Sequence, residues 1–446
     1  MQNVNQSKLF NASCIALIVT AMTFAIRAGI LTELSETFTL TETELGWVNS
    51  MAFLGFPIAM IIGGLLYNQV GPKLMMYGAF FCHLLGLVLT ITAGGFVGLL
   101  VSTFFIGFAN GCVEAACNPL IADMYHENKT TMLNKFHVWF PGGIVIGSLV
   151  AFAMEGMNWQ YQIAVMIVPT LIYGYFVFTS KFPKIEHIEN DTSENIKGLF
   201  NPLFFFILIC MTLTATSEFG TTQWVDRILG KAGANPMLIL ALVTGVMAAG
   251  RYFAGGLVHR LNPSGVLWTS AIVTTIGIYM LSISTGGMVY VAAFLFALGI
   301  CYFWPTMIGF TAENIPKTGA LGMSLVGGAG MFAMTIWNPV IGQWLDQHRI
   351  DQLGVNGGNA TDMLMDFKKS LANAQMTVKE LTDKYMANGG TETENQLNAA
   401  KASLAKLDAI ELAAGQATLG NLAIFPAILI ILFGGLFFYM KNRKTA

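Results

Sequence analysis

The chain has 446 residues, of which 54% are hydrophobic and 11% are charged, and its mean hydropathy is +0.61. A soluble globular protein carries about twice that share of charged residues, so the composition excludes a soluble protein and predicts one embedded in a lipid bilayer. The formal net charge of −2 gives no electrostatic basis for binding nucleic acid.

Twelve apolar segments follow one another along the chain, each close to the roughly 20 residues that cross a bilayer as a helix. The predicted fold class is therefore an all-α membrane protein with twelve transmembrane helices. The first segment lacks a small-residue cleavage site and is followed by a second span, so we interpret it as a retained helix and not as a signal peptide. The segments lie near residues 12–34, 46–66, 74–93, 98–122, 136–154, 160–180, 201–224, 237–258, 265–284, 289–312, 320–344 and 418–440.

The basic residues of the loops predict the orientation of these helices. With a cytoplasmic N-terminus, twelve Lys and Arg residues fall on the cytoplasmic side, whereas the opposite short loops hold Arg227 and Lys231. The positive-inside rule then places both termini in the cytoplasm. We expect a multi-pass protein of the bacterial inner (cytoplasmic) membrane that functions as a monomer.

A polar segment between the sixth and seventh spans divides the chain into two halves. We predict an N-terminal six-helix half over residues 1–180, a cytoplasmic linker over 181–200 and a C-terminal six-helix half over 201–446. The division into six and six spans predicts that the two halves share one architecture.

Similar residues follow the second span of each half, and they support this division. The first half has Gly64-Leu-Leu-Tyr-Asn68-Gln69-Val-Gly71-Pro72-Lys73, and the second has Gly256-Leu-Val-His-Arg-Leu-Asn-Pro263. The pattern resembles the loop signature of the major facilitator superfamily, G-x-x-x-D-R-x-G-R-R, with Asn68 in place of its Asp and Gln69 in place of its Arg. The resemblance implies two pseudo-symmetric halves that enclose a site near the middle of the membrane.

The C-terminal half includes a hydrophilic insertion, residues 346–416, which the predicted orientation places outside the cytoplasm. Residues 361–388 and 392–414 have the composition of helices and are separated by Gly389-Gly390, so we predict an antiparallel helical hairpin. The hairpin could dock a partner or cover the outer vestibule; we favour a decoration without a role in transport. Its apolar contacts are expected among Leu364, Phe367, Leu371 and Met376 on one helix and Leu397, Leu404, Leu407 and Ile410 on the other.

A single carboxylate, Glu114, interrupts the fourth span, which otherwise carries no formal charge from Leu99 to Ala122. A charge at this depth costs about 2.5 to 3.5 kcal/mol, so such a residue usually faces a protein interior or a wet cavity. Asn110 and Asn118 stand four residues before and after Glu114 and therefore share its helix face. This polar stripe predicts a binding or proton-coupling site; the alternative is a carboxylate that is hydrogen-bonded between helices for structural reasons.

The run from Gly111 to Pro119 resembles the fourth helix of the fucose/galactose/glucose:proton symporter family, which carries an acid followed by small residues and Asn-Pro. The runs from Gly250 to Pro263 and from Tyr302 to Thr306 are similar to two further segments of that family. In that family the fourth-helix acid lies in the central cavity and takes part in proton coupling and sugar binding. The resemblance therefore implies this role for Glu114.

The first span departs from this family, which has an acidic residue there, because it carries Arg27 and no acid before Glu33. A guanidinium more than halfway along a span needs an anionic partner or a ligand. Arg27 could form an ion pair with Glu114 that breaks and re-forms during transport, or it could bind a carboxylate, sulfate or phosphate of the solute. A third interpretation is that Arg27 snorkels toward the outer headgroups.

Other polar and aromatic side chains of the spans complete the predicted site. Asn134 and His137 share a face of the fifth span, where His137 could contact the solute, relay a proton or bond a neighbouring helix. Glu218 lies in a polar run of the seventh span and is a second candidate for the coupling acid, or it solvates one end of that helix. Aromatic and amide groups suit a saccharide, although aromatic side chains are also common in packing. The remaining candidates are Gln223, Trp224, Trp304 and Asn338.

These features together predict a secondary active transporter that imports a sugar or sugar derivative by proton symport and alternating access. Its expected partners are a small-molecule solute and protons. We expect no cofactor, no metal and no enzymatic activity, because no phosphate loop, metal cluster or nucleophile arrangement occurs at usable spacing, and the energy then comes from the proton gradient. Two alternatives stay open: an organic-anion or sugar-acid carrier that uses Arg27, and a non-translocating nutrient sensor that uses the outer hairpin.

Overall fold

The computed structural model describes residues 5–125, 132, 135–183, 196–353 and 360–445. These residues form α-helices and a short 3-10 turn (Pro316–Thr318), which confirms the predicted all-α membrane fold. In this part of the chain, eleven helical stretches are long and apolar enough to cross a membrane. The eighth predicted span corresponds to a shorter apolar helix of 17 residues, α12 (Pro236–Tyr252).

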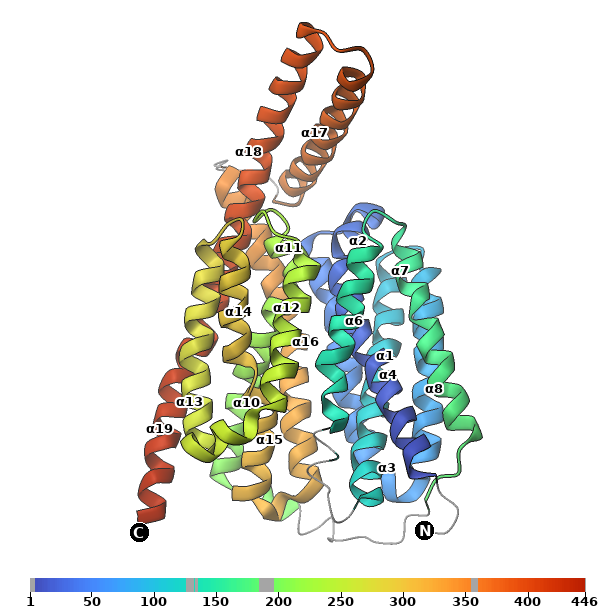
Figure 1. Ribbon diagram of the computed structural model, residues 1–446, viewed down its shortest axis with the longest axis vertical. Helices are drawn as coiled ribbons and strands as arrows, with labels where there is room; N and C mark the ends of the chain where they lie inside the picture. The colour runs from blue at the N-terminus through green and yellow to red at the C-terminus, as the bar shows by residue number, and fades with distance from the viewer. Residues whose placement is uncertain (1–4, 126–131, 133–134, 184–195, 354–359, 446) are drawn as a thin grey trace.

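The helices form two bundles that lie side by side (Figure 1). The first bundle contains α1 (Gln6–Gly29), α2 (Leu31–Phe38), α3 (Glu42–Ile91), α4 (Phe96–Met124), α6 (Trp139–Ala153), α7 (Trp159–Val165) and α8 (Ile167–Thr179). The second contains α10 (Pro202–Thr222), α11 (Val225–Leu229), α12, α13 (Ala254–Ile283), α14 (Met288–Ile300), α15 (Phe303–Asn314), α16 (Gly319–Leu353), α17 (Ala360–Asn388), α18 (Thr391–Leu422) and α19 (Ile424–Thr445).

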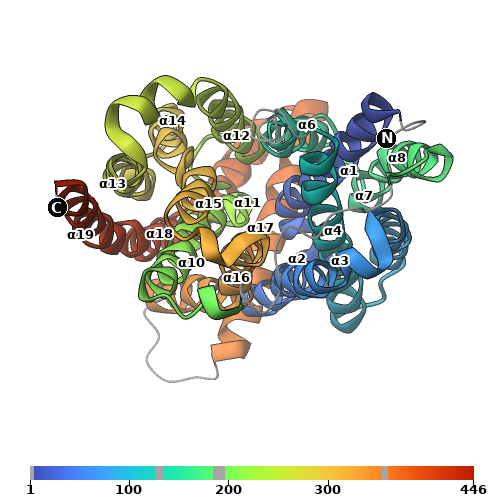
Figure 2. The ribbon, with the colours of Figure 1, turned by 90° about the horizontal axis from the view of Figure 1, so that it is seen from below.

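The two ends of the molecule differ (Figure 1). α17 and α18 project from one end, which we call the hairpin face. α1 begins and α19 ends at the opposite end, which we call the termini face. Viewed along the helices, the boundary between the bundles is formed by α3 against α16 and by α6 against α12 (Figure 2).

The two similar segments after the second span of each half contain breaks inside long helices. α3 breaks at Gly71, with a φ of 75°, directly before Pro72, and α13 breaks at Asn262, with a φ of 55°, directly before Pro263. A left-handed residue interrupts the helical hydrogen bonds, and a proline is well suited to the first position of the next helix. A helix break formed by a residue with positive φ followed by proline therefore occurs at corresponding positions in the two halves.

α17 and α18 form the predicted antiparallel hairpin, with Gly389 and Gly390 at its tip. Leu364, Phe367 and Leu397 are buried as expected. Met376 is 61% exposed and therefore does not belong to the apolar contact between the two helices. α18 does not end at residue 414 as predicted, because it continues to Leu422 at the start of the last membrane span. The hairpin is thus a continuation of the membrane helices.

Candidate functional site

Glu114 in α4 is part of a hydrogen-bonded chain of three side chains. Its Oε2 atom accepts a hydrogen bond of 2.7 Å from Asn118 Nδ2, and Asn118 Oδ1 lies 3.0 Å from His137 Nε2, which donates to it. Glu114 is 8% exposed, and no ion-pair partner is found for it among the described side chains. The hydrogen-bond donor found for it among the described side chains is therefore a neutral amide.

Arg251, at the end of α12, connects this chain electrostatically to the second bundle. It acts on His137 across the boundary and also on the carboxylate of Glu218 in α10, which is 6% exposed. Its Nε donates a hydrogen bond of 3.0 Å to the carbonyl oxygen of Cys301. Arg251 was not among the residues predicted for the site, although it is the only Lys or Arg between residues 237 and 258, and that signal would have found it.

Asn110 belongs to a separate, fully buried group. Its Oδ1 accepts a hydrogen bond of 2.8 Å from His83 Nε2, and its Nδ2 donates one of 3.0 Å to Thr23 Oγ1. Because the amide oxygen can only accept, His83 carries its proton on Nε2, so its Nδ1 accepts the hydrogen bond of 2.8 Å from the Tyr173 hydroxyl. These four side chains are at most 2% exposed. They join α1, α3, α4 and α8. Asn110 therefore belongs to this group and not to the chain of Glu114, Asn118 and His137.

Arg27 and Glu114 do not meet in this structure. Thr23 in α1 contacts Asn110 in α4. Arg27 lies one helical turn beyond Thr23 toward the hairpin face, and Glu114 lies one turn beyond Asn110 toward the termini face. At a rise of 1.5 Å per residue, these two turns separate the charges by about 12 Å along the helices.

Arg27 is 6% exposed and has one hydrogen bond, which Nη2 donates to Gln223 Oε1 over 2.8 Å. The guanidinium lies 5.3 Å and 5.8 Å from the ring centroids of Phe24 and Phe53, within cation–π range. Its Nε and Nη1 have no hydrogen-bond partner among the described side chains. Burial of a charge with a single neutral partner is costly, so Arg27 is a candidate for binding an anion. The snorkelling interpretation does not fit this burial.

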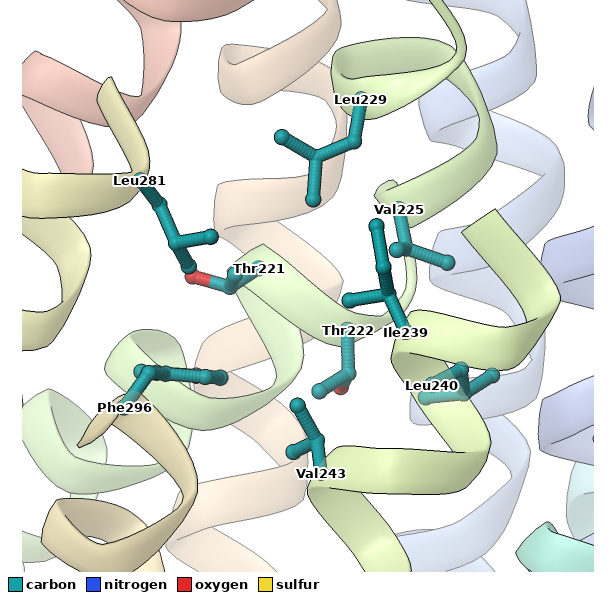
Figure 3. Close-up of a pocket in the computed structure, with 9 residues that line it drawn as sticks. All are labelled: Thr221, Thr222, Val225, Leu229, Ile239, Leu240, Val243, Leu281 and Phe296. Carbon is teal, nitrogen blue, oxygen red and sulfur yellow. The ribbon is translucent and has the colours of Figure 1, made fainter. Parts of the chain in front are cut away.

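Within the described part of the chain, a pocket lies inside each bundle. Arg27 lines the one in the first bundle together with the hydroxyl-bearing side chains of Thr23, Thr90 and Thr103. The pocket drawn in Figure 3 lies inside the second bundle and is lined by apolar side chains and by Thr221 and Thr222. No predicted site residue lines the second pocket, so the pocket beside Arg27 is the better candidate for a polar ligand group.

Gln223 and Trp224, which follow α10, both form hydrogen bonds with side chains of other helices. Gln223 accepts a hydrogen bond from Arg27, and Trp224 Nε1 donates one of 3.0 Å to Asn338 Oδ1 in α16. Trp304 in α15 is half-buried and packs edge-to-face against Phe219, with centroids 6.4 Å apart. The prediction for Asn134 falls outside the described residues.

A cluster of charges at the hairpin face was not predicted from the sequence. Glu42, at the start of α3, is fully buried: Arg227 Nε donates to both of its oxygens at 3.1 Å, and Arg349 Nη1 lies 3.0 Å from its Oε1. Arg349 is also fully buried and pairs with Glu411 in α18 at 2.6 Å. Glu42 comes from the first bundle and its partners come from the second, so the ion pairs hold the bundles together.

Further polar contacts join the bundles on the same side. Asp226 accepts hydrogen bonds from Thr32, Asp346 accepts from Thr43, and Ser50 Oγ donates to the carbonyl oxygen of residue 335. Among the side chains that the structure describes, every hydrogen bond or ion pair found between the two bundles lies toward the hairpin face. The molecule is therefore closed at that face.

Comparison with known proteins places this arrangement in a family. Residues 13–348 match the Major Facilitator Superfamily, which is more than half of the chain. The hexuronate transporter of Bacillus subtilis is 21% identical over 360 residues, covering 73% of this chain and 83% of that protein. Among solved structures, a D-xylose-proton symporter has a TM-score of 0.66 at 13% identity, covering 76% of this chain and 90% of its own.

The fucose:proton symporter of Escherichia coli has a TM-score of 0.53 at 15% identity, covering 94% of this chain and 98% of its own. At these identities the solved structures establish the fold alone. The two helical bundles, the paired helix breaks and the match over residues 13–348 identify this chain as a member of the major facilitator superfamily, and hence as a multi-pass membrane transporter and not an enzyme.

Proposed function

We propose that the protein imports a sugar or sugar derivative across the bacterial inner membrane by proton symport and alternating access, with the hairpin face outside and both termini in the cytoplasm. The observation that carries the proposal is the hydrogen-bonded chain of Glu114, Asn118 and His137. A carboxylate that is bonded to an amide can gain or lose a proton as nearby charges move. Two relatives of the same fold are named as sugar-proton symporters.

The proton gradient is sufficient for this task. A charge that crosses a potential of 100 mV gains about 2.3 kcal/mol. At about 1.36 kcal/mol per tenfold change, one proton supports roughly fifty-fold accumulation of a neutral solute.

The test begins with a thermal-shift screen of the purified protein against monosaccharides, amino sugars and uronic acids, which identifies the solute. Uptake into proteoliposomes with an imposed pH gradient then measures coupling. We expect Glu114→Gln to equilibrate the solute without concentrating it. Glu36→Gln, which removes an exposed carboxylate of α2, is the matched control and should concentrate the solute as the unchanged protein does. If Glu114→Gln still concentrates the solute, Glu114 is not the coupling acid, and Glu218→Gln is tested next.

Arg27 favours a second candidate function, the transport of an organic anion such as a sugar acid. Two of its nitrogens have no partner among the described side chains, and it lines a pocket with three threonines. A carboxylate binds a guanidinium through two parallel hydrogen bonds, which would satisfy such nitrogens. The hexuronate transporter of Bacillus subtilis, whose name specifies a sugar acid, supports this candidate.

Binding assays with a matched pair of ligands separate the two candidates. For an anion carrier, Arg27→Gln should abolish binding of a uronic acid and spare binding of the neutral sugar with the same ring. If Arg27→Gln weakens the two ligands equally, Arg27 does not bind the carboxylate.

A further inference from the structure

The hairpin of α17 and α18 is anchored in the second bundle. α18 packs along α11, α13 and α16. Asp408 in α18 pairs with Lys231 at 2.9 Å, and Glu411 pairs with the buried Arg349 at 2.6 Å. Because α18 also continues into the last membrane span, the base of the hairpin moves with the second bundle.

Among the described side chains of α17, Lys368 forms the hydrogen bonds and the ion pair found with the first bundle. Its Nζ donates a hydrogen bond of 3.0 Å to Ser35 Oγ in α2 and another to the carbonyl oxygen of Leu40, and it lies 3.5 Å from Glu42 Oε1. The Lys368 side chain is 20% exposed, whereas the neighbouring Lys369 is exposed. Lys368 is thus the third cation of the second half, after Arg227 and Arg349, that acts on Glu42.

In this structure, in which the hairpin face is closed, the contacts of Lys368 bridge the two bundles. When that face opens, Glu42 and the acceptors on α2 move with the first bundle, and Lys368 moves with the second. Hydrogen bonds that involve a charged group are stronger than those between neutral groups, so the loss of these contacts adds to the free-energy cost of opening.

We propose that the hairpin is a latch, in which Lys368 holds the hairpin face closed and is released each time that face opens. This role rests on the alternating access of the proposed function. It assigns a gating role to Lys368 in an insertion for which the sequence analysis favours no role in transport.

The test uses double electron–electron resonance to measure the distance between two spin labels on the full chain, and it needs no solute. The labels are attached at Thr37→Cys in α2 and Gly287→Cys before α14. Both positions are exposed at the hairpin face, and nothing lies within 4 Å of a side chain added at Gly287. The six native cysteines are replaced in this background.

We expect Lys368→Met to raise the ratio of open to closed molecules about tenfold or more, seen as a longer label distance. Lys369→Met removes the same charge one residue away on the same helix and should leave the distances unchanged. Lys368→Arg keeps the cation and should restore the closed distance. Ser35→Ala removes one acceptor and should give a smaller shift in the same direction, even if Lys368→Met fails to fold.

The latch is refuted if Lys368→Met and Ser35→Ala leave the distances as they are, or if Lys369→Met changes them as much as Lys368→Met. The label distances are measured without solute or a proton gradient, so they test the latch even if the uptake assay shows no proton coupling. The two proposals can therefore fail independently.

Discussion

Arg27 donates a hydrogen bond of 2.8 Å to Gln223 across the boundary between the two bundles, and Gln223 is the only hydrogen-bond partner found for it among the described side chains. A buried guanidinium normally pairs with a carboxylate. Here the partner is a neutral amide, and no carboxylate that pairs with the guanidinium is found among the described side chains.

Replacing Gln223 by Glu tests whether the positive charge of Arg27 is used. The new carboxylate would neutralise Arg27 and occupy the place of an anionic ligand, so we expect Gln223→Glu to weaken the binding of a uronic acid at least tenfold and to raise the melting temperature of the ligand-free protein. Thermal-shift titration measures both. Gln223→Met, which removes the hydrogen bond without adding a charge, should keep uronic acid binding; equal loss in the two variants would contradict the prediction.

Gly46 permits the close contact of α3 with α16 that closes the hairpin face. A Cβ atom at Gly46 would lie 2.6 Å from the backbone of Asn338 and of Pro339. Overpacking of this kind costs about 1 to 3 kcal/mol, so Gly46→Ala should shift the spin-label distances toward the open state.

Gly78→Ala is the control for this substitution, because nothing lies within 4 Å of the added methyl group. It changes the same residue type inside the same long helix α3. An unchanged distance distribution in Gly46→Ala would mean that the contact of α3 with α16 does not limit closure.

The closed state should depend on pH through Glu33 in α2. Burial raises the pKa of Glu33 from its usual 4.5 to about 7, and the carboxylates of Asp226, Glu36 and Glu155 contribute to the shift. A raised pKa means that closure favours the protonated acid, so the closed fraction should fall as the pH rises from about 4.5 to about 7. The fixed positive charge of Arg227, which contacts Thr32 beside Glu33, does not titrate in this range.

Spin-label distances recorded across this pH window measure the effect. Glu33→Gln should flatten the profile, whereas Glu380→Gln, an exposed carboxylate of α17, should leave it as it is. A closed fraction that rises with pH would reverse the sign and contradict the prediction.

The buried group of His83, Tyr173 and Asn110 should contribute to stability as a unit. His83→Leu leaves the Asn110 oxygen and the Tyr173 hydroxyl without partners, and each unsatisfied group costs about 1 to 3 kcal/mol. Tyr173→Phe removes one hydroxyl and should cost less. Thermal unfolding in detergent measures both, and in the double variant the losses should be smaller than their sum, because one bond is counted twice. Strictly additive losses would mean that the two side chains do not interact.

The sequence predicted the features that depend on local physical chemistry. The bilayer accepts only segments that are apolar and satisfy their own backbone hydrogen bonds, so the spans could be found from hydropathy. The breaks at Gly71 and Asn262 followed from the residues there and from the prolines after them. The two helices of the hairpin followed from composition and from Gly389-Gly390.

Which side chains meet was decided by the tertiary structure alone. The sequence indicated Glu114, Asn118 and His137 as site residues, but it did not show that they form one hydrogen-bonded chain. It also left open whether Arg27 pairs with Glu114. It gave no sign that Glu42 meets Arg227 and Arg349, because these residues lie on different helices of different bundles. Such contacts depend on how each helix is rotated and how deep it sits against its neighbours, and those quantities are fixed only when the two bundles pack together.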